Sequence, residues 1–421
     1  MHVRERLKES LWLWPLVFIV GGLVLSQITG LIDEDVHRGD NASTLFTESV
    51  DDARTVVSTI ASSMLTFLGV VFSITLVALQ TSSSQYSPRV VRRFVRSRTT
   101  KLTLATFLGT YVYCLIVLGS FQSASTDNGR AYVPVVSVLV AEIAALVCLL
   151  MFVAFVHNTV QSMRVTFLIK NVSDETRTSI IANTVPDAYA AEVDPRSLGD
   201  PHDVVCFDHS PGVLDGVEVD RLLQLAGQHD VVLRLVPMVG TYLSSGTALL
   251  EVYGTSTPPL RAILACFDIE AERTLYQDTS YGIRQLVDVA IRALSPAVND
   301  PTTAVQVIDR LEDLLLRIGQ KADRSNAVTD ANGTVRLVFP RPTWANITEL
   351  AFTELRIYGA TAPQVTRRLI AVFDELERRL PDHAADDVKR HRALLMAAVE
   401  RLILDDNERL VALTPDPRGL G

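Results

Sequence analysis

The stretch that decides the fold class is residues 132–157, YVPVVSVLVAEIAALVCLLMFVAFVH. It contains one carboxylate, Glu142, and one histidine, His157, and no other charged side chain. A helix needs about 20 predominantly apolar residues to cross a hydrocarbon core of about 30 Å. Three earlier stretches have the same character, at residues 11–32, 56–79 and 102–122. We therefore expect a bundle of four transmembrane helices within residues 1–170.

The composition agrees with a membrane domain that is followed by a more polar part. Hydrophobic residues make up 48% of the chain, the mean hydropathy is +0.24, and charged residues make up 21%. Up to Lys170 the chain has 14 basic and 11 acidic residues, whereas the remainder has 25 and 37. These values exclude a purely soluble protein, a disordered chain and a nucleic-acid binder with a basic domain.

Basic residues set the expected orientation, because cytoplasmic loops carry an excess of Lys and Arg. The amino end and the loop at 84–101 are basic, and the loop between the first two spans is acidic. The amino end also resembles a signal peptide, but its apolar stretch is too long and no cleavage site precedes Asp33. Both termini and the large carboxy-terminal part are therefore expected in the cytoplasm.

The second apolar stretch carries a line of polar and small side chains. Ser62, Thr66, Gly69, Ser73 and Gln80 lie within about 40° of one line along a helix. One interpretation is a face that lines a water-filled membrane path. The alternative is close helix–helix packing, which small residues and hydroxyl groups promote in lipid.

Glu142 is the only carboxylate of the fourth stretch. A charged side chain near the bilayer centre costs at least about 3 kcal/mol, so such residues usually face the interior of a bundle and are functional candidates. The alternative is a neutral Glu142 that is hydrogen-bonded to a hydroxyl such as that of Thr106, Thr110 or Ser62. The candidate membrane-path residues are Glu142, Ser62, Thr66 and Ser73.

The loop at 84–101, SQYSPRVVRRFVRSRTTK, is expected to form a basic amphipathic helix. Ser87 can cap it, and Pro88 suits its first turn. Such a helix at the cytosolic surface is typical of contact with anionic lipids, and a vestibule that collects anions in front of a pore is the alternative. The candidate lipid-contact residues are Arg89, Arg92, Arg93 and Arg96.

The cytosolic part is expected to be α+β. Residues 182–202 are polar and punctuated by proline, which is typical of a connector. Within residues 203–270, the pattern Gly240-x-x-Leu243-x-x-Gly246-x-x-Leu249 is similar to small β-sandwich modules of the biotinyl and lipoyl type, which carry their cofactor on a lysine. No lysine occurs at 171–320, so a covalently bound cofactor is excluded. Residues 271–421 show mainly helical spacing.

Two helices are expected to meet at residues 295–302, SPAVNDPT. Arg284 and Asp288 are spaced to pair along the first helix, and a proline ends it. Asn299 or Asp300 can cap the second helix, so good capping accounts for much of the pattern. The functional interpretation is a polar ligand pocket in the turn, because loop clusters often form sites. Its candidate residues are Ser295, Asn299, Asp300 and Thr302.

Motifs that would indicate an enzyme are absent from the sequence. The phosphate-binding patterns GxxxxGK[ST] and GxGxxG, the zinc motif HExxH and the nucleophile motif GxSxG do not occur. The four cysteines are far apart, and no Cys or His residues have the spacing of metal ligands. We therefore expect neither catalysis nor a bound metal or cofactor.

Two separated motifs resemble those of a known family. SQYSPR at 84–89 is followed by LGTYVY at 108–113, and ALSPAVNDPTTA stands at 293–304. These segments are similar to the bacterial membrane proteins called domain of unknown function 2254, and the resemblance covers nearly the whole chain. It implies a protein that crosses the bacterial inner membrane several times. It implies no catalytic residue, because the family is defined without an activity.

The sequence is compatible with two kinds of function. The first is an oligomeric ion channel or small-solute pore that the cytosolic part regulates. Four spans are few for a secondary transporter, whereas a symmetric homo-oligomer suits a pore. The alternative is a membrane-anchored scaffold or ligand sensor without transport activity. Glu142 and the polar line around Ser62 favour the first.

Overall fold

The computed structural model describes residues 13–38, 50–85, 98–121, 134–183, 187–321 and 325–420. The chain forms two compact units, Met1–Arg164 and Val165–Gly421. The boundary lies a few residues before the expected end of the membrane domain at residue 170. The reason is that helix α7 (Val165–Ala182) buries Leu168, Ile169 and Val172 against helices of the second unit.

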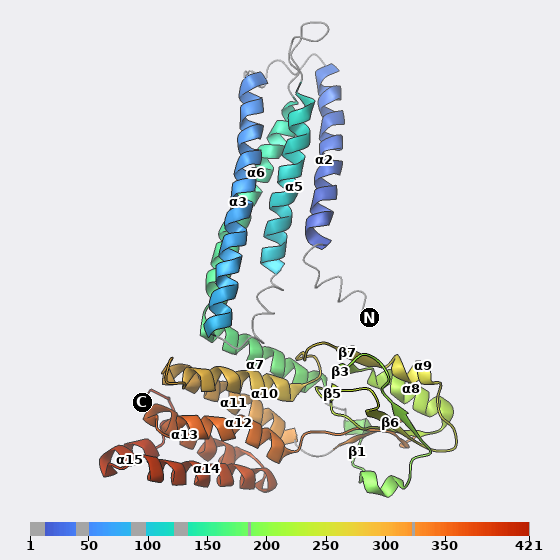
Figure 1. Cartoon of the computed structure of the whole chain (residues 1–421), viewed down its shortest axis with the longest axis vertical. Helices are drawn as coiled ribbons and strands as arrows, with labels where there is room; N and C mark the ends of the chain where they lie inside the picture. Colours follow the sequence, from blue (N-terminus) through green and yellow to red (C-terminus); the bar gives the residue numbers. More distant parts are fainter. Residues whose placement is uncertain are drawn as a thin grey trace. The chain divides into compact units, whose positions relative to one another are not determined.

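The first unit consists of long apolar helices (Figure 1). They are α2 (Leu13–Arg38), α3 (Val50–Gln85), α5 (Arg98–Ser120) and α6 (Val135–Ser162). Four of their segments are long and apolar enough to span a membrane: Leu13–Asp35, Asp51–Gln80, Arg98–Ser120 and Val135–Ser162. Four such helices were expected, and the membrane-protein class is confirmed.

Helix α5 is the centre of the first unit, and α2, α3 and α6 all pack against it. Helices α2 and α5 approach each other closely at two glycines. A Cβ atom added to Gly22 would lie 2.7 Å from the carbonyl oxygen of Gly109, and one added to Gly109 would lie 2.9 Å from that of Phe18. The absence of side chains therefore lets the two backbones touch, as small residues do in membrane helix pairs.

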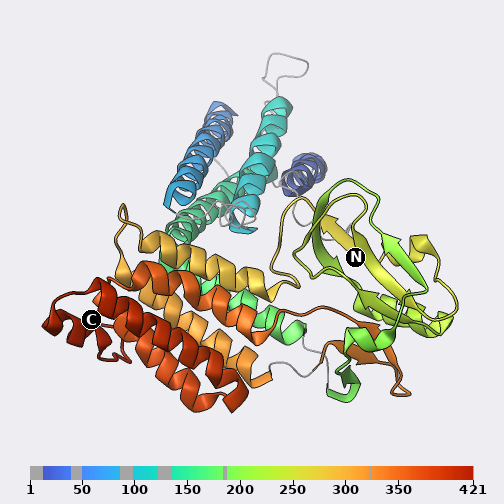
Figure 2. The same cartoon turned by 60° about the horizontal axis from the view of Figure 1, so that its bottom comes forward.

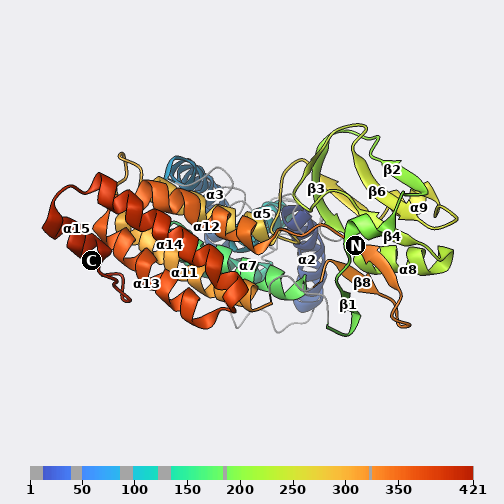
Figure 3. The same cartoon turned by 90° about the horizontal axis from the view of Figure 1, so that it is seen from below.

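Helices form one end of the second unit, as Figures 2 and 3 show. They are α7, α10 (Thr279–Ala293), α11 (Pro301–Lys321), α12 (Trp344–Gly359), α13 (Pro363–Arg379), α14 (Asp382–Leu402) and α15 (Asp406–Leu413). Several begin at a side-chain cap: Asp278 accepts from the Tyr281 N–H, and Thr343 forms a capping box with Asn346. Their apolar faces pack on one another, as the helical spacing of 271–421 predicts.

Two sheets form the other end of the second unit. Their strands are β1 (Ala190–Ala191), β2 (Asp203–Cys206), β3 (Gly212–Val217), β4 (Val232–Leu235), β5 (Tyr242–Leu243), β6 (Ala248–Tyr253), β7 (Phe267–Glu270), β8 (Ala327–Thr329) and β9 (Val335–Val338). One sheet has the order β1-β8-β9-β4-β6-β2 and the other β5-β3-β7. All pairings are antiparallel except β4 with β9. Two short helices, α8 (Val219–His229) and α9 (Leu260–Leu264), accompany them.

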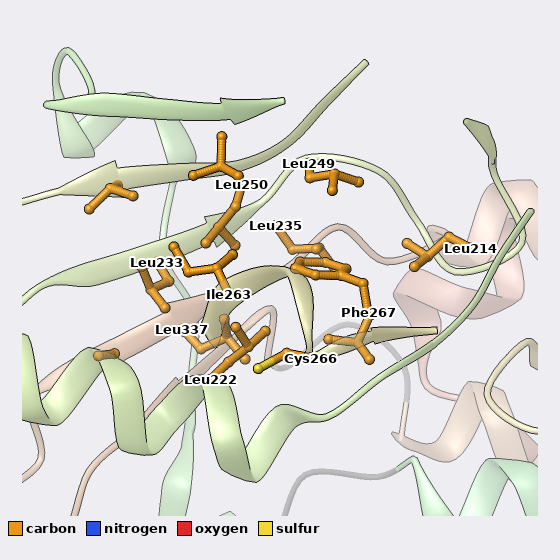
Figure 4. Close-up of a cluster of buried hydrophobic side chains, with 14 of the residues drawn as sticks. Leu214, Leu222, Leu233, Leu235, Leu249, Leu250, Ile263, Cys266, Phe267 and Leu337 are labelled. Atoms are coloured by element: carbon orange, nitrogen blue, oxygen red, sulfur yellow. The ribbon is translucent and has the colours of Figure 1, made fainter. Parts of the chain in front are cut away.

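The sheet end extends beyond the expected module at 203–270. Strand β1 comes from the expected connector, which also holds the short turns η2 (Asp187–Tyr189) and η3 (Pro195–Leu198). The β8–β9 hairpin comes from the expected helical region and places Leu337 in the core beside Leu222 and Leu233 (Figure 4). The second unit therefore combines mixed sheets with helices, and residues 203–270 do not form the larger sheet alone.

Candidate functional site

Helix α3 has two faces of different chemistry. Ala53, Val57, Ala61, Val71 and Ala78 are buried within the first unit. The opposite line, about 180° around the helix, is exposed and mostly polar. We call the following set the α3 polar face: Asp51, Thr55, Ser58, Thr59, Ser62, Thr66, Gly69, Ser73 and Gln80. It includes all the polar and small residues that the sequence places on one line.

The α3 polar face does not pack within this chain. The candidates Ser62, Thr66 and Ser73 are exposed. The hydroxyl of Ser62 donates to the carbonyl oxygen of Ser58 at 2.9 Å, and that of Thr66 donates to the carbonyl oxygen of Ser62 at 3.0 Å. Packing inside the chain's own bundle therefore does not account for these residues.

The polar character is most continuous in the amino-terminal half of α3. In the carboxy-terminal half, the exposed side chains of Leu76 and Val77 flank the line. Between Asp51 and Thr66 the line is formed by polar side chains. Any aqueous contact of this face is therefore most extensive near the beginning of the helix.

Glu142 is also exposed, on α6, so it does not face the interior of this chain's bundle. It lies seven residues beyond Val135, the first residue of α6, or roughly 10 Å along this 28-residue helix. It is therefore in the amino-terminal half and not near the centre. Of the hydroxyls considered as partners, Thr106 donates within its own helix and Thr110 contacts the sulfur of Cys148.

Glu142 lies level with the amino-terminal half of the α3 polar face. Helices α3 and α6 run parallel, because buried clusters near their beginnings and further along contain corresponding parts of both. The ring centroids of Phe67 and Phe152 are 5.0 Å apart. Ten residues earlier on each helix stand Val57 and Glu142. Around the helix axis, Thr59 lies about 80° from Phe67, and Glu142 lies about 80° from Phe152. Both residues are on the side of their helix that faces away from α5.

The sequence did not reveal a buried polar cluster between α2, α5 and α6. Asp33, only 3% exposed, accepts from the backbone N–H groups of Val136 and Ser137 at 2.7 and 3.0 Å and from the Ser137 hydroxyl at 2.5 Å. Tyr113 donates to the Ser137 carbonyl at 3.0 Å and contacts the Thr29 hydroxyl at 3.1 Å. Asp33 therefore caps α6. Its partners Val136 and Ser137 lie too far along the chain for a short-range sequence pattern to predict this contact.

The candidate lipid-contact residues Arg89, Arg92, Arg93 and Arg96 lie outside the described residues. Helix α3 continues to Gln85, and α5 begins at Arg98. Contact of the 84–101 segment with anionic lipid stays a prediction.

The four candidates of the turn at 295–302 lie together where α10 ends and α11 begins. The Ser295 hydroxyl donates to the backbone at the end of α10 at 2.7 Å. Asp300 caps α11 by accepting from the backbone N–H and the hydroxyl of Thr303 at 3.1 and 2.5 Å. Asn299 has a left-handed backbone with φ 49°, and its side chain and that of Thr302 are exposed. Ser295 and Asp300 thus stabilise the turn, and the exposed pair is available to a ligand.

The sheet and helical ends of the second unit are joined next to α10. The side chain of Gln277 accepts from the Val217 N–H at 2.8 Å and donates to the Val217 carbonyl at 3.0 Å. Asp278 caps α10, and its burial raises the pKa of its carboxyl group above the ordinary value. In the part of the chain that the structure describes, no three His, Cys, Asp or Glu side chains are placed to bind a metal ion.

Comparison with known proteins identifies a family and relatives that match nearly the whole chain. The family of predicted membrane proteins with domain of unknown function 2254 matches residues 8–375. An uncharacterised protein of Mycobacterium tuberculosis is 28% identical over 424 residues, which cover 98% of this chain and 80% of the relative. An uncharacterised protein of Mycobacterium bovis has the same identity and coverage. No solved structure matches the chain significantly.

Proposed function

We propose that the chain, which belongs to the family of predicted membrane proteins with domain of unknown function 2254, forms an oligomeric ion channel or small-solute pore. In this proposal it lies in the bacterial inner membrane with both termini in the cytoplasm, as the basic loops predict. The second unit, Val165–Gly421, is the regulatory part.

The observation that carries the proposal is the outward direction of the α3 polar face. Mainly apolar side chains pack between α3 and its neighbours α5 and α6, so the described residues offer no polar path along α3 within one chain. Lipid tails offer no polar partners to the exposed hydroxyl, carboxylate and amide groups of α3 and α6. A second copy of the chain, or water enclosed between copies, offers such partners. A symmetric homo-oligomer with α3 facing the common axis places these groups along an aqueous path.

The test is solute flux from liposomes that contain the purified full-length protein. The variant that removes three hydroxyls, Ser62→Ala with Thr66→Val and Ser73→Ala, is expected to reduce flux about tenfold, because a narrow path loses water-like groups along its length. The control is Thr75→Val, which removes a hydroxyl that donates to the Val71 carbonyl on the half-buried side of α3.

Equal flux in the triple variant and in wild-type protein would contradict an α3-lined path. Wild-type protein without flux for any common ion or small solute would overturn the pore altogether. The result would then favour the alternative function, a membrane-anchored scaffold or ligand sensor, with the turn at 295–302 as the place to seek a ligand.

A further inference from the structure

We propose that the path is selective for cations and that Asp51 and Glu142 determine this selectivity. This inference rests on the proposed function and adds the charge class of the transported solute. It is carried by the positions of two exposed carboxylates relative to the α3 polar face. The hydroxyl groups of that face are uncharged and do not by themselves favour cations over anions.

Asp51 continues the α3 polar face at the beginning of the helix. It lies about 20° from the line through Ser62. Its side chain is exposed, like those of the hydroxyl residues that follow it. The neighbouring Arg54 is also exposed but lies about 80° from that line. Among the described residues, the α3 polar face therefore carries a negative and no positive side chain.

Glu142 adds a second carboxylate from α6. The contact between Phe67 and Phe152 places it level with residues 57–59 of α3, and on the same side. Asp51 lies about six to eight residues earlier, or roughly 10 Å along the helix. The two carboxylates thus stand at successive depths beside the most continuous part of the polar face.

Symmetry multiplies these groups, because each copy in a ring contributes one Asp51 and one Glu142. Rings of carboxylates attract cations and repel anions, and a narrow path with low-dielectric walls strengthens the effect. Two successive levels of carboxylates suit cation conduction, since an ion must be able to leave each site for the next.

The test is the reversal potential of the full-length protein in a planar bilayer with a KCl gradient. Wild-type protein is expected to favour K⁺ over Cl⁻. Glu142→Gln is expected to reduce the K⁺/Cl⁻ permeability ratio about tenfold while current persists, and Asp51→Asn less, because its site is closer to bulk water. Asp51→Asn with Glu142→Gln is expected to lower the ratio furthest.

The matched control is Asp35→Asn, which removes an exposed carboxylate from α2. Helices α2 and α3 lie on either side of α5 (Figures 1 and 2), so this variant is expected to keep the wild-type ratio. Current without K⁺ preference, or an unchanged K⁺/Cl⁻ permeability ratio in the double variant, would overturn the cation selectivity but would not contradict the proposed pore. Wild-type protein without current would overturn both.

Discussion

At the scale of single residues, His391 is a buried titratable group of the second unit. It is fully buried in α14, and neither ring nitrogen has a hydrogen-bond partner among the described residues. Burial lowers its pKa to about 4; Glu349, whose carboxylate lies 4.0 Å from Nε2, opposes the shift, and Arg390 and Arg356 add to it. The folded protein therefore holds the neutral imidazole.

His391 is expected to make the protein acid-sensitive. The pKa in the folded state lies below the value of about 6.5 in the unfolded chain, so stability is complete above pH 6.5 and falls as the pH drops towards 4. Between pH 7 and pH 5 this residue lowers the free energy of unfolding by about 2 kcal/mol. Denaturant unfolding of the full-length protein in detergent measures the loss, which His391→Leu is expected to remove. His383→Leu, on an exposed histidine of the same helix, is the control and should leave the loss unchanged.

At the scale of elements, the crossing of α2 and α5 depends on Gly22 and Gly109. Gly109→Ala puts a methyl group 2.9 Å from the backbone oxygen of Phe18, which rigid helices cannot relieve without moving apart. We expect a loss of about 1–3 kcal/mol, which is typical of overpacking. A lowered thermal midpoint of the full-length protein in detergent measures it. Gly119→Ala, on the same helix with open space around it, should be neutral or slightly stabilising; equal midpoints for the two variants would show that the crossing tolerates separation.

Elements whose causes are local were predictable from the sequence. The length of the apolar stretches predicted the four spans. Short-range spacing predicted the turn at 295–302, in which Asp300 caps α11. It also predicted the ion pair of Arg284 with Asp288. Pairing between distant segments was not predictable. Strand β9 joins β4 across about 100 residues, and Asp33 caps α6 across 103 residues; in both cases tertiary packing selects the partner.

The direction in which a polar line faces was not predictable from the sequence either. Helical spacing places Ser62, Thr66 and Ser73 on one line, but it does not say whether that line faces a neighbouring helix or the surroundings. Burial of Ala53 and Val71 on the opposite side answers the question for this chain. Membrane carboxylates usually face the interior of a bundle, but Glu142 is exposed on the bundle of a single chain. In the proposed assembly it faces the interior that several copies form together.

At the scale of the whole molecule, the proposal requires that copies of the chain meet through α3. Cysteine cross-linking in membranes tests this contact. Among the native cysteines, Cys114, Cys148 and Cys266 are buried and Cys206 is exposed, so Cys206→Ser gives a background with little thiol reactivity. In this background Thr66→Cys puts a thiol on the α3 polar face, and Val20→Cys puts one on α2, where the native side chain is 57% exposed.

Addition of a bismaleimide is expected to link Thr66→Cys chains into dimers, because a symmetric ring brings the same residue of neighbouring copies close together. Val20→Cys chains are expected to stay monomeric, since an apolar surface such as that of α2 is well solvated by lipid and needs no protein partner. Dimers from Val20→Cys alone would place the contact on α2 and remove α3 from the common axis. Monomers from both variants would contradict an assembly around α3, and with it any path that the α3 polar face and Glu142 could line.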